Sequence, residues 1–190
     1  MPLSADTPRR PAVFLDRDGV LNIDHHYVHR PDQFEWVTGA PAAIKYLNQR
    51  GYHVFVVTNQ SGVARGYYTE DDVEQLHRHI NRELARHDAH VDAWFYCPHH
   101  PSGKGSYALP CSCRKPLPGM LRAAALRYDI DLEQSYMVGD KQADIEAGMA
   151  AGCHTILVRT GYGEKEEQAL DGPVEIRDDL LAAVIAILQV

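Results

Sequence analysis

Residues 13–22 read "VFLDRDGVLN", so a short apolar run passes directly into two aspartates and a glycine. Alternate residues of an extended chain point the same way, so Asp16 and Asp18 can reach one site while Arg17 points elsewhere, and Gly19 lets the chain turn away. Two carboxylates this close repel each other unless a cation or a proton joins them. Mg²⁺ suits such oxygens together with a substrate phosphate, and a carboxylate can also attack phosphorus. The competing interpretation is a solvated Asp-Arg-Asp-Gly turn.

The rest of the chain alternates predicted strands with predicted helices. Five runs rich in Val, Ile, Phe and Tyr predict strands at residues 12–15, 53–57, 93–96, 136–138 and 155–158. Helical patterns occupy residues 40–51, 69–88, 118–129, 143–152 and 178–190. The alternation predicts an α/β fold with a parallel sheet and helices on both faces. We expect a single domain over residues 1–190, with solvated histidines on or near the second helix at His77, His79, His87 and His90.

Composition narrows the classes of partner. With 45% hydrophobic and 24% charged residues, the chain of 190 residues is typical of a globular protein. Its net charge of -7 lacks the basic excess of a nucleic-acid-binding protein. No run approaches the roughly 20 apolar residues that cross a bilayer, and the N-terminal "MPLSADTPRRP" has no apolar signal core. We therefore expect a cytoplasmic monomer without nucleic-acid or membrane partners.

Polar motifs follow three of the predicted strands. They read "DRDG" (16–19), "TNQSG" (58–62) and "GDKQAD" (139–144). Ligands of open parallel sheets bind beyond the carboxyl ends of the strands, so these motifs should converge on one crevice. The Thr58 hydroxyl and nearby backbone N–H groups could cradle a phosphate, although a polar loop with local turns would look the same.

Two further motifs bring cations and carboxylates. "CRKPLPGM" (113–120) offers Arg114 and Lys115 to a phosphate, unless they form an ordinary exposed basic pair. Asp140 could complete the coordination of Mg²⁺, and Asp144 could bind the ion through water or hold Lys115 in place. The alternative is that Asp140 or Lys141 caps the following helix.

The cysteines point to a metal. "CPHH" (97–100) and "CSC" (111–113) bracket a long loop, and three cysteines with one histidine match a closed tetrahedral zinc site. Spacing alone leaves both His99 and His100 open as the fourth ligand. Free thiols are the alternative, and a disulfide is disfavoured in a reducing compartment. The loop 97–113 leads into Arg114 and Lys115, so zinc would position them. Cys153 is expected to be a small buried apolar residue.

The ordered set "DRDGVLN", "VVTNQSG", "RKP" and "VGDKQAD" strongly resembles the haloacid dehalogenase (HAD) superfamily of phosphotransferases over residues 12–160. The resemblance implies a Rossmann-like fold in which Asp16 attacks phosphorus. Asp18 would protonate the leaving oxygen and then activate water, while Thr58 and Lys115 hold the phosphoryl oxygens. The Mg²⁺ site implied by the resemblance comprises Asp16, the backbone carbonyl of Asp18, Asp140 and Lys141. Only about 40 residues separate Asp16 from Thr58, which leaves no room for a separate cap domain there.

The same motifs, with "TNQSGVARGYY" and "CPHHP", resemble one narrower family, the D-glycero-D-manno-heptose 1,7-bisphosphate phosphatases. That family removes the 7-phosphate in the ADP-heptose pathway that feeds the lipopolysaccharide core. The resemblance implies zinc ligands at Cys97, His99, Cys111 and Cys113. It implies substrate contacts at Asp24, His25, His26, Tyr27, Asn59, Gln60, Ser61 and Arg114. A second phosphate could bind Arg65, Arg114 and the His25–His26 pair.

Two other functions compete with a phosphatase for the heptose bisphosphate. Histidinol-phosphate phosphatases resemble this family in fold, motifs and zinc loop. A phospho-accepting receiver domain would also use Mg²⁺, an acceptor Asp, a Thr and a Lys. A receiver, however, needs a lasting aspartyl-phosphate, whereas Asp18 two residues after the acceptor promotes turnover. The zinc loop also has no evident use in a receiver. The sequence therefore favours a Mg²⁺-dependent phosphoric monoester hydrolase.

Overall fold

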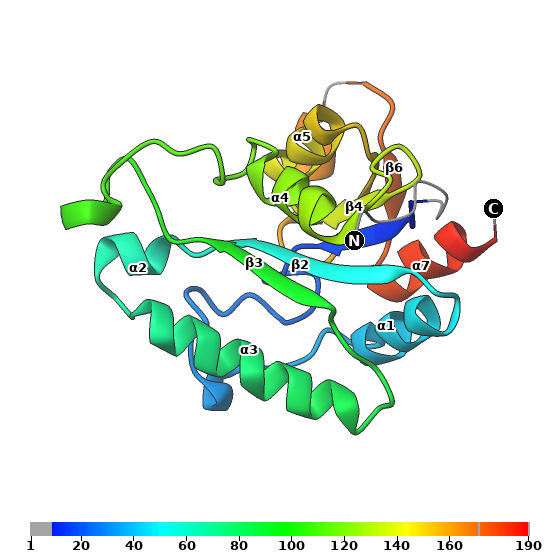
Figure 1. The fold of residues 1–190 in the computed structure, drawn as a ribbon, viewed down its shortest axis with the longest axis horizontal. Coiled ribbons are helices and arrows are strands. Elements are labelled where there is room, and N and C mark those ends of the chain that lie inside the picture. Colours follow the sequence, from blue (N-terminus) through cyan, green and yellow to red (C-terminus); the bar gives the residue numbers. More distant parts are fainter. Residues whose placement is uncertain (1–8, 171, 190) are drawn as a thin grey trace, which may run out of the picture.

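One parallel sheet organises the chain. The computed structural model describes residues 9–170 and 172–189. Six strands lie in the order β3-β2-β1-β4-β5-β6, and every neighbouring pair is parallel (Figure 1). The strands are β1 (Ala12–Leu15), β2 (His53–Asn59), β3 (Ala93–Cys97), β4 (Tyr136–Gly139), β5 (His154–Val158) and β6 (Glu175–Arg177). The predicted parallel α/β sheet is confirmed.

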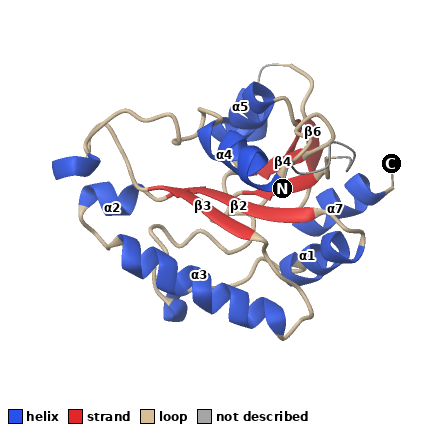
Figure 2. Cartoon of the chain, in the orientation of Figure 1, coloured by secondary structure: helices blue, strands red, loops and turns tan. Residues whose placement is uncertain are grey.

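Helices cover both faces of this sheet, as Figure 2 shows. They are α1 (Ala40–Gln49), α2 (Ser61–Arg65), α3 (Glu70–Ala85), α4 (Gly119–Tyr128), α5 (Gln142–Ala151), α6 (Gly163–Glu166) and α7 (Leu180–Leu188). Val13 and Leu15 of β1 pack with α1, α3 and α7, whereas Phe14 packs with α4 and α5. Alternate side chains of a strand face opposite sides of a sheet, so this short strand is buried on both faces. Among the described residues, no helix has the length and apolarity needed to span a bilayer.

The chain order explains where a ligand site should lie. From β1 the chain builds outward to β2 and β3, and it then returns to place β4 on the other side of β1. Connections therefore leave β1 and β4 in opposite directions, and this switch point opens a crevice at their carboxyl ends. Asp16 follows β1 and Asp140 follows β4, so both carboxylates stand at this crevice.

Among the strands and α-helices, three were not predicted from the sequence, namely the edge strand β6 and the short helices α2 and α6. The edge strand β6 holds only Glu175, Ile176 and Arg177, of which Glu175 is exposed and the other two are half-buried. Charged residues are common on short edge strands, and they remove the apolar run that marks a strand. The short helix α2 follows β2 directly, and β2 itself continues to Asn59. Thr58 and Asn59 therefore end the strand instead of beginning a loop.

One histidine of α3 departs from expectation. Thr69 caps this helix, because its hydroxyl accepts a hydrogen bond from Asp72 N and its own N–H donates to the Asp72 carboxylate. His77, expected to be solvated, is only 4% exposed. Its ring stacks on that of Trp94 with centroids 4.2 Å apart. The prediction was wrong because residue 77 lies one helical turn beyond Val73, on the apolar face.

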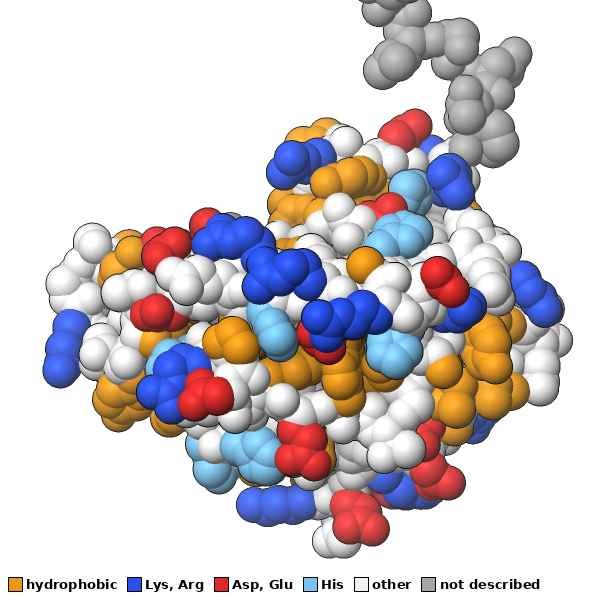
Figure 3. All heavy atoms as spheres, turned by 90° about the horizontal axis from the view of Figure 1, so that it is seen from below, with side chains coloured by type: hydrophobic (Ala, Val, Ile, Leu, Met, Phe, Trp, Pro, Cys, Tyr) orange, Lys and Arg blue, Asp and Glu red, His pale blue; other side chains and the backbone are white. Residues whose placement is uncertain are grey.

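The surface beneath the sheet has a mixed charge. Figure 3 shows basic, acidic and histidine side chains interspersed on the face that lies below the sheet in Figure 1, with hydrophobic side chains between them. This face therefore carries side chains of both charges.

Candidate active site

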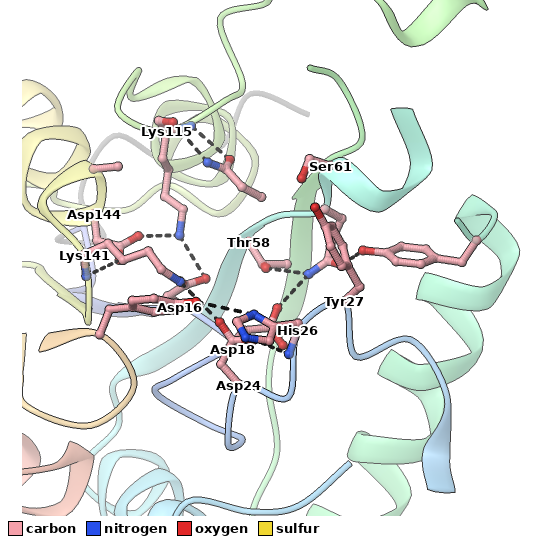
Figure 4. A pocket seen from close by; sticks show the side chains of 15 residues that line it. Asp16, Asp18, Asp24, His26, Tyr27, Thr58, Ser61, Lys115, Lys141 and Asp144 are labelled. Carbon is pink, nitrogen blue, oxygen red and sulfur yellow. Dashed lines mark hydrogen bonds and ion pairs between the residues drawn. The ribbon is translucent and has the colours of Figure 1, made fainter. Parts of the chain in front are cut away.

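The three strand-end motifs meet in one cavity. It has a volume of about 240 Å³ and lies at the carboxyl ends of β1, β2 and β4 (Figure 4). The residues that line it are Asp16, Asp18, Asp24, His26, Tyr27, Thr58, Asn59, Gln60, Ser61, Tyr68, Lys115, Lys141, Ala143, Asp144 and Tyr162. Asp140 lies beneath this wall, fully buried. The structure thus brings together segments far apart in the sequence, as the motifs predict.

Lys115 holds two of the carboxylates together. Its Nζ lies 3.0 Å from Asp16 Oδ1 and 2.5 Å from Asp144 Oδ1, and it donates a hydrogen bond to Val57 O at 2.7 Å. Burial lowers the pKa of Lys115, but the Asp144 and Asp16 carboxylates outweigh burial and raise the pKa above its ordinary value. Lys115 is therefore a buried ammonium facing the cavity. Asp144 holds it in place, which is one of the two roles considered for this carboxylate.

Asn59 and Gln60 fix the groups around Lys115 and Asp18. The Asn59 side chain donates to the backbone carbonyl of Lys115 at 3.0 Å and accepts from its N–H at 3.1 Å. Gln60 Nε2 donates to Thr58 Oγ1 at 2.8 Å and to Asp18 Oδ2 at 3.1 Å. Tyr68 donates its hydroxyl proton to Gln60 Oε1 at 2.7 Å. The Asn59 and Gln60 side chains therefore connect the end of β2 to the segments that carry Lys115 and Asp18.

The Asp18 carboxylate forms an ion pair with the side chain of the preceding residue, Arg17. Arg17 does not point elsewhere as expected, because its fully buried guanidinium returns to Asp18 Oδ2 at 2.9 Å. Burial raises the pKa of Asp18, but the charge of Arg17 and hydrogen bonds from Asn22, Arg17 and Gln60 outweigh burial and leave the pKa below its ordinary value. Asp18 is thus ionised in the free protein, the form that a general base requires. A bound phosphate would raise its pKa again, because like charges disfavour ionisation.

Asp140 gives the clearest indication of where a cation would fit. One oxygen, Oδ2, accepts a hydrogen bond from Tyr162 N at 2.9 Å, whereas Oδ1 is buried without a hydrogen-bond donor among the described residues. Carboxylate oxygens of Asp16, Asp140 and Asp144 lie within 4.8 Å of one another. Burial and the Asp16 charge raise the pKa of Asp140 to about 8. A divalent cation that prefers oxygen would remove this repulsion, so the donor set fits Mg²⁺.

Lys141 lies beside this acidic group. Its Nζ is 3.6 Å from Asp140 Oδ1 and 3.6 Å from Asp24 Oδ2. Burial lowers its pKa, but Asp16 and Asp140 outweigh burial and raise it. A protonated ammonium has no lone pair, so Lys141 can serve Mg²⁺ only through its backbone carbonyl. Lys141 is also the N-cap residue of α5, and its N–H donates to Asp144 Oδ2 at 3.1 Å. The capping interpretation is therefore confirmed for Lys141, and its role toward Mg²⁺ stays a prediction.

Two predicted substrate contacts do not lie in the cavity wall. His25 is exposed next to a turn in which Asp24 accepts a hydrogen bond from His26 N, and its ring lies 3.1 Å from Glu35 Oε2. It does not line this cavity, and its role toward a substrate stays a prediction. Arg114 donates to His99 O at 3.3 Å and lies on the zinc loop, next to Lys115. Its role toward a substrate stays a prediction.

Three lining residues were missed in the sequence, namely Tyr68, Ala143 and Tyr162. Tyr162 had a visible signal. The segment "TGYGE" (160–164) comes just after the last strongly apolar strand, so it had to reach the same edge of the sheet. Gly161 has φ +61°, and a Cβ there would clash with Asp140 Oδ2. A Gly-Tyr-Gly turn at a strand end is therefore a sign of close approach to a site.

The predicted zinc ligands form a second cluster. Donor atoms of Cys97, His99, Cys111 and Cys113 lie within 4.8 Å of one another. The three sulfur atoms are 3.1–3.4 Å apart, and His99 Nδ1 lies 3.5 Å from Cys113 Sγ. Three thiols and one imidazole around a common centre fit tetrahedral Zn²⁺. His100 instead accepts a hydrogen bond from Ser102 N at Nδ1, which favours His99. Cys153 is buried away from this cluster, as expected.

Known proteins share the sequence and the fold of this chain. A family model described as "HAD-hyrolase-like" matches residues 112–183. The D-glycero-beta-D-manno-heptose-1,7-bisphosphate 7-phosphatase of Pasteurella multocida (strain Pm70) is 50% identical over 151 residues, 79% of this chain and 82% of that protein. Its counterpart in Escherichia coli (strain K12) is 46% identical over 178 residues, 92% of this chain and 93% of that protein. The crystal structure of D,D-heptose 1,7-bisphosphate phosphatase from B. bronchiseptica, complexed with magnesium and phosphate, has a TM-score of 0.87 at 40% identity, covering 94% of this chain and 98% of that one.

Proposed function

The chain belongs to the heptose-1,7-bisphosphate 7-phosphatase family of HAD-like hydrolases, and on this premise we propose that it removes the 7-phosphate of D-glycero-D-manno-heptose 1,7-bisphosphate. The observation that carries the proposal is the meeting of Asp16, Asp18, Lys115 and Asp140 at the switch point of the sheet. The product would serve ADP-heptose synthesis for the lipopolysaccharide core. We also propose a cytoplasmic monomer whose partner is this small phosphorylated sugar.

The reaction would proceed in two displacements at phosphorus. Asp16 attacks, a bond forms between its carboxylate oxygen and phosphorus, and the bond from phosphorus to the sugar oxygen breaks as Asp18 gives that oxygen a proton. A water molecule then attacks the aspartyl-phosphate and gives a proton to Asp18, which releases inorganic phosphate and restores Asp16. The ion pair with Arg17 favours the ionised Asp18 that this second step needs.

Cationic and polar groups would hold the phosphoryl oxygens. Lys115, Thr58 and Ser61 line the cavity on the side of β2 and α2. Asp16, Asp140 and the backbone carbonyl of Asp18 would hold Mg²⁺, which would supply neutralisation of charge on the phosphoryl group. Lys141 contributes through its backbone carbonyl and adds a positive charge from its side chain. Phosphoryl transfer depends on positioning and charge neutralisation, which these groups supply.

The zinc loop would support this machinery from outside. Four protein donors leave no open position, so zinc at Cys97, His99, Cys111 and Cys113 would be structural. Cys113 is followed directly by Arg114 and Lys115, and the Asn59 side chain holds the Lys115 backbone from the other direction. Zinc would therefore fix the point from which the buried Lys115 ammonium reaches Asp16.

A group of cationic side chains beside the cavity would bind the second phosphate of the substrate. Arg65 lies on α2, one turn after Ser61, and its NH2 group is 3.5 Å from His100 Nε2. Burial, together with the charges of Arg114 and Arg65, lowers the pKa of His100, so the three side chains are neighbours. Arg65 Nε is buried without a hydrogen-bond partner among the described residues. We infer that Arg65 and Arg114, and not the His25–His26 pair, hold the 1-phosphate.

A substrate panel tests the function. Phosphate release is measured with both anomers of the heptose 1,7-bisphosphate and with histidinol phosphate, using wild type and Asp16→Asn. We expect cleavage of the 7-phosphate of the bisphosphate, and a loss of roughly a thousandfold or more in Asp16→Asn, because an amide cannot serve as the nucleophile. The isosteric variant should keep its fold, as circular dichroism would show. Preference for histidinol phosphate, or a variant with wild-type turnover, would refute the proposal.

A further inference from the structure

Tyr162 occupies a turn that is pressed against the metal-binding end of β4. The turn, residues 161–163, follows β5, and its Tyr162 N–H donates to Asp140 Oδ2 at 2.9 Å. Glycines flank the tyrosine, and a Cβ at Gly161 would clash with the Asp140 carboxylate. A Cβ at Gly163 would clash with Val158 O. The backbone of Tyr162 is therefore fixed, and its half-buried side chain lines the cavity.

The ring of Tyr162 lies under the Lys141 ammonium. Lys141 Nζ is 4.6 Å from the ring centroid. The other partners of this ammonium, Asp24 and Asp140, are 3.6 Å away, beyond ordinary hydrogen-bond distance. An ammonium above an aromatic face is attracted by the negative charge on the ring. Together with the Asp24 and Asp140 carboxylates, the Tyr162 ring therefore holds the Lys141 ammonium toward the cavity.

The hydroxyl of Tyr162 reaches the opposite wall. It lies 3.4 Å from His26 Nδ1. His26 and Tyr27 both have positive φ, 60° and 54°, a backbone conformation that is rare for residues other than glycine. Such a loop needs support from its surroundings. Asp24 supports it from within by accepting the His26 N–H, and Tyr67 packs edge-on against the Tyr27 ring at 4.8 Å. Tyr162 supplies the contact from the β5 side.

We propose that Tyr162 is a positioning residue for the phosphatase reaction proposed above. Its ring keeps the Lys141 ammonium directed at the phosphoryl site, and its hydroxyl keeps His26, and with it residues 24–27, in place for the sugar. The two halves of the side chain then have separable effects. Loss of the hydroxyl weakens recognition of the sugar, whereas loss of the ring also impairs handling of any phosphomonoester.

Two variants separate these effects. Tyr162→Phe keeps the ring and removes the hydroxyl, and Tyr162→Leu removes both. KM and kcat are measured for the heptose bisphosphate and for p-nitrophenyl phosphate, which has no sugar. For Tyr162→Phe we expect a KM for the bisphosphate that is about threefold to tenfold higher, with kcat and the p-nitrophenyl phosphate kinetics unchanged. For Tyr162→Leu, kcat/KM for p-nitrophenyl phosphate should also fall by about fivefold. Tyr46→Leu, at an exposed tyrosine of α1, is the control and should match wild type.

A binding measurement keeps the inference independent of turnover. Calorimetric titration with inorganic phosphate, at saturating Mg²⁺, should show weaker binding to Tyr162→Leu by about fivefold and wild-type binding to Tyr162→Phe. If wild type hydrolyses neither ester, the proposed function fails, while this titration still decides the role of the ring. Wild-type kinetics and phosphate affinity in Tyr162→Leu would overturn the inference. So would equal losses in both variants on both substrates, because rescue by Phe separates positioning from general support of the fold.

Discussion

At the scale of single residues, Asp140 shows how the backbone prepares a site for a cation. Its carboxylate is fully buried and has one oxygen without a hydrogen-bond donor among the described residues. Gly19 and Gly161 approach it so closely that a Cβ on either would meet Oδ2. Because Gly19 and Gly161 have no side chains, there is room for the Asp140 carboxylate between them. Burying a carboxylate with one oxygen that lacks a hydrogen-bond donor is costly, which is why the arrangement favours a bound ion.

Replacing Gly161 by alanine tests this role of the glycine. Gly161→Ala would place a Cβ against Asp140 at a backbone φ of +61°. We expect weaker Mg²⁺ binding, phosphatase activity at least about tenfold lower and a free energy of unfolding reduced by about 1 to 3 kcal/mol. Calorimetric titration with Mg²⁺ and chemical denaturation would measure the changes. Gly105→Ala is the matched control, since it has φ +56° but open space at the Cβ, and it should lose stability without losing Mg²⁺. Equal Mg²⁺ affinity in both variants would contradict the argument.

Single residues also show which parts of the candidate site could be predicted from the sequence and which could not. Asp16, Asp18, Thr58 and Asp140 were found because each stands at or just beyond a strand end in a recognisable motif, and Lys115 was found in the basic motif that precedes α4. Tyr162 was missed because its role depends on contacts with His26 and Lys141, which only the folded chain brings together. His25 lies outside the cavity wall, next to a turn in which Asp24 accepts the His26 N–H. The distances between side chains on different loops depend on the fold of the whole chain, so local sequence patterns do not predict them.

At the scale of elements, apolar runs predicted five of the six strands. Strands buried on both faces, such as β1, leave a continuous apolar signal, and the half-buried edge strand β3 leaves an aromatic one. The edge strand β6 leaves none. Helix α3 shows a related gap, since its apolar stripe was recognised but His77 was not included in it. A histidine carries no hydropathy signal that distinguishes a stacked, buried ring from a solvated one. Its position on the helix was the available clue.

The buried His77 predicts how stability responds to acid. Burial, with a smaller effect of Arg17, holds its pKa well below 6.5. Below about pH 6.5 the unfolded chain therefore binds a proton at this residue that the folded chain does not, so stability falls as pH falls. The contribution reaches at most about 1.4 kcal/mol per pH unit. We expect His77→Phe, whose ring can still stack on Trp94, to lose less unfolding free energy between about pH 6.5 and 5 than wild type.

Denaturant unfolding at several pH values would measure this difference. His87→Gln, at an exposed histidine that follows α3, is the control and should keep the wild-type pH dependence. The prediction concerns the slope with pH, so an overall change in stability of the variant does not affect it. Parallel curves for wild type and His77→Phe would show that His77 is not the group that titrates.

The zinc loop gives a second prediction at this scale. Cys111→Ser removes one of four donors that lie within 4.8 Å of one another. We expect loss of most of the zinc and a free energy of unfolding lower by several kcal/mol, with a smaller change in Mg²⁺ affinity, because the two clusters share no ligand. Metal analysis of the purified protein and denaturation would measure both effects. Cys153→Ala, at a buried thiol outside the cluster, should retain its zinc. One zinc per chain in Cys111→Ser would show that the ligand set is wrong.

At the scale of the whole molecule, specificity has to come from loops. Residues 17–52 contain only one α-helix, α1, and no domain covers the cavity from this segment. The wall is instead built by Asp24, His26 and Tyr27, by Ser61 of α2 with Tyr68, and by the turn at Tyr162. The absence of a cap was predictable from the distance between Asp16 and Thr58 in the sequence. The arrangement of these loops was not, since each depends on contacts among segments more than 30 residues apart.

The proposed binding of the second phosphate by Arg114 predicts that Arg114→Ala impairs hydrolysis of the bisphosphate selectively. Arg114→Ala removes a guanidinium near Arg65 and His100 without touching a residue of the cavity wall. We expect kcat/KM for the 1,7-bisphosphate to fall by roughly tenfold to a hundredfold, while hydrolysis of the 7-monophosphate stays close to wild type, because only the bisphosphate carries the distal charge. Steady-state kinetics on both substrates would measure the preference.

Arg114 also donates to the backbone carbonyl of His99, so loss of zinc has to be separated from loss of a phosphate contact. Arg65→Ala removes the neighbouring cation without changing the zinc loop and should shift the preference in the same direction. Arg78→Ala, at an exposed arginine of α3, should change neither substrate. If Arg114→Ala keeps its zinc and still prefers the bisphosphate as wild type does, the distal phosphate is not bound by this cluster. The cavity wall at His26, Tyr27 and Lys141 would then have to provide that contact.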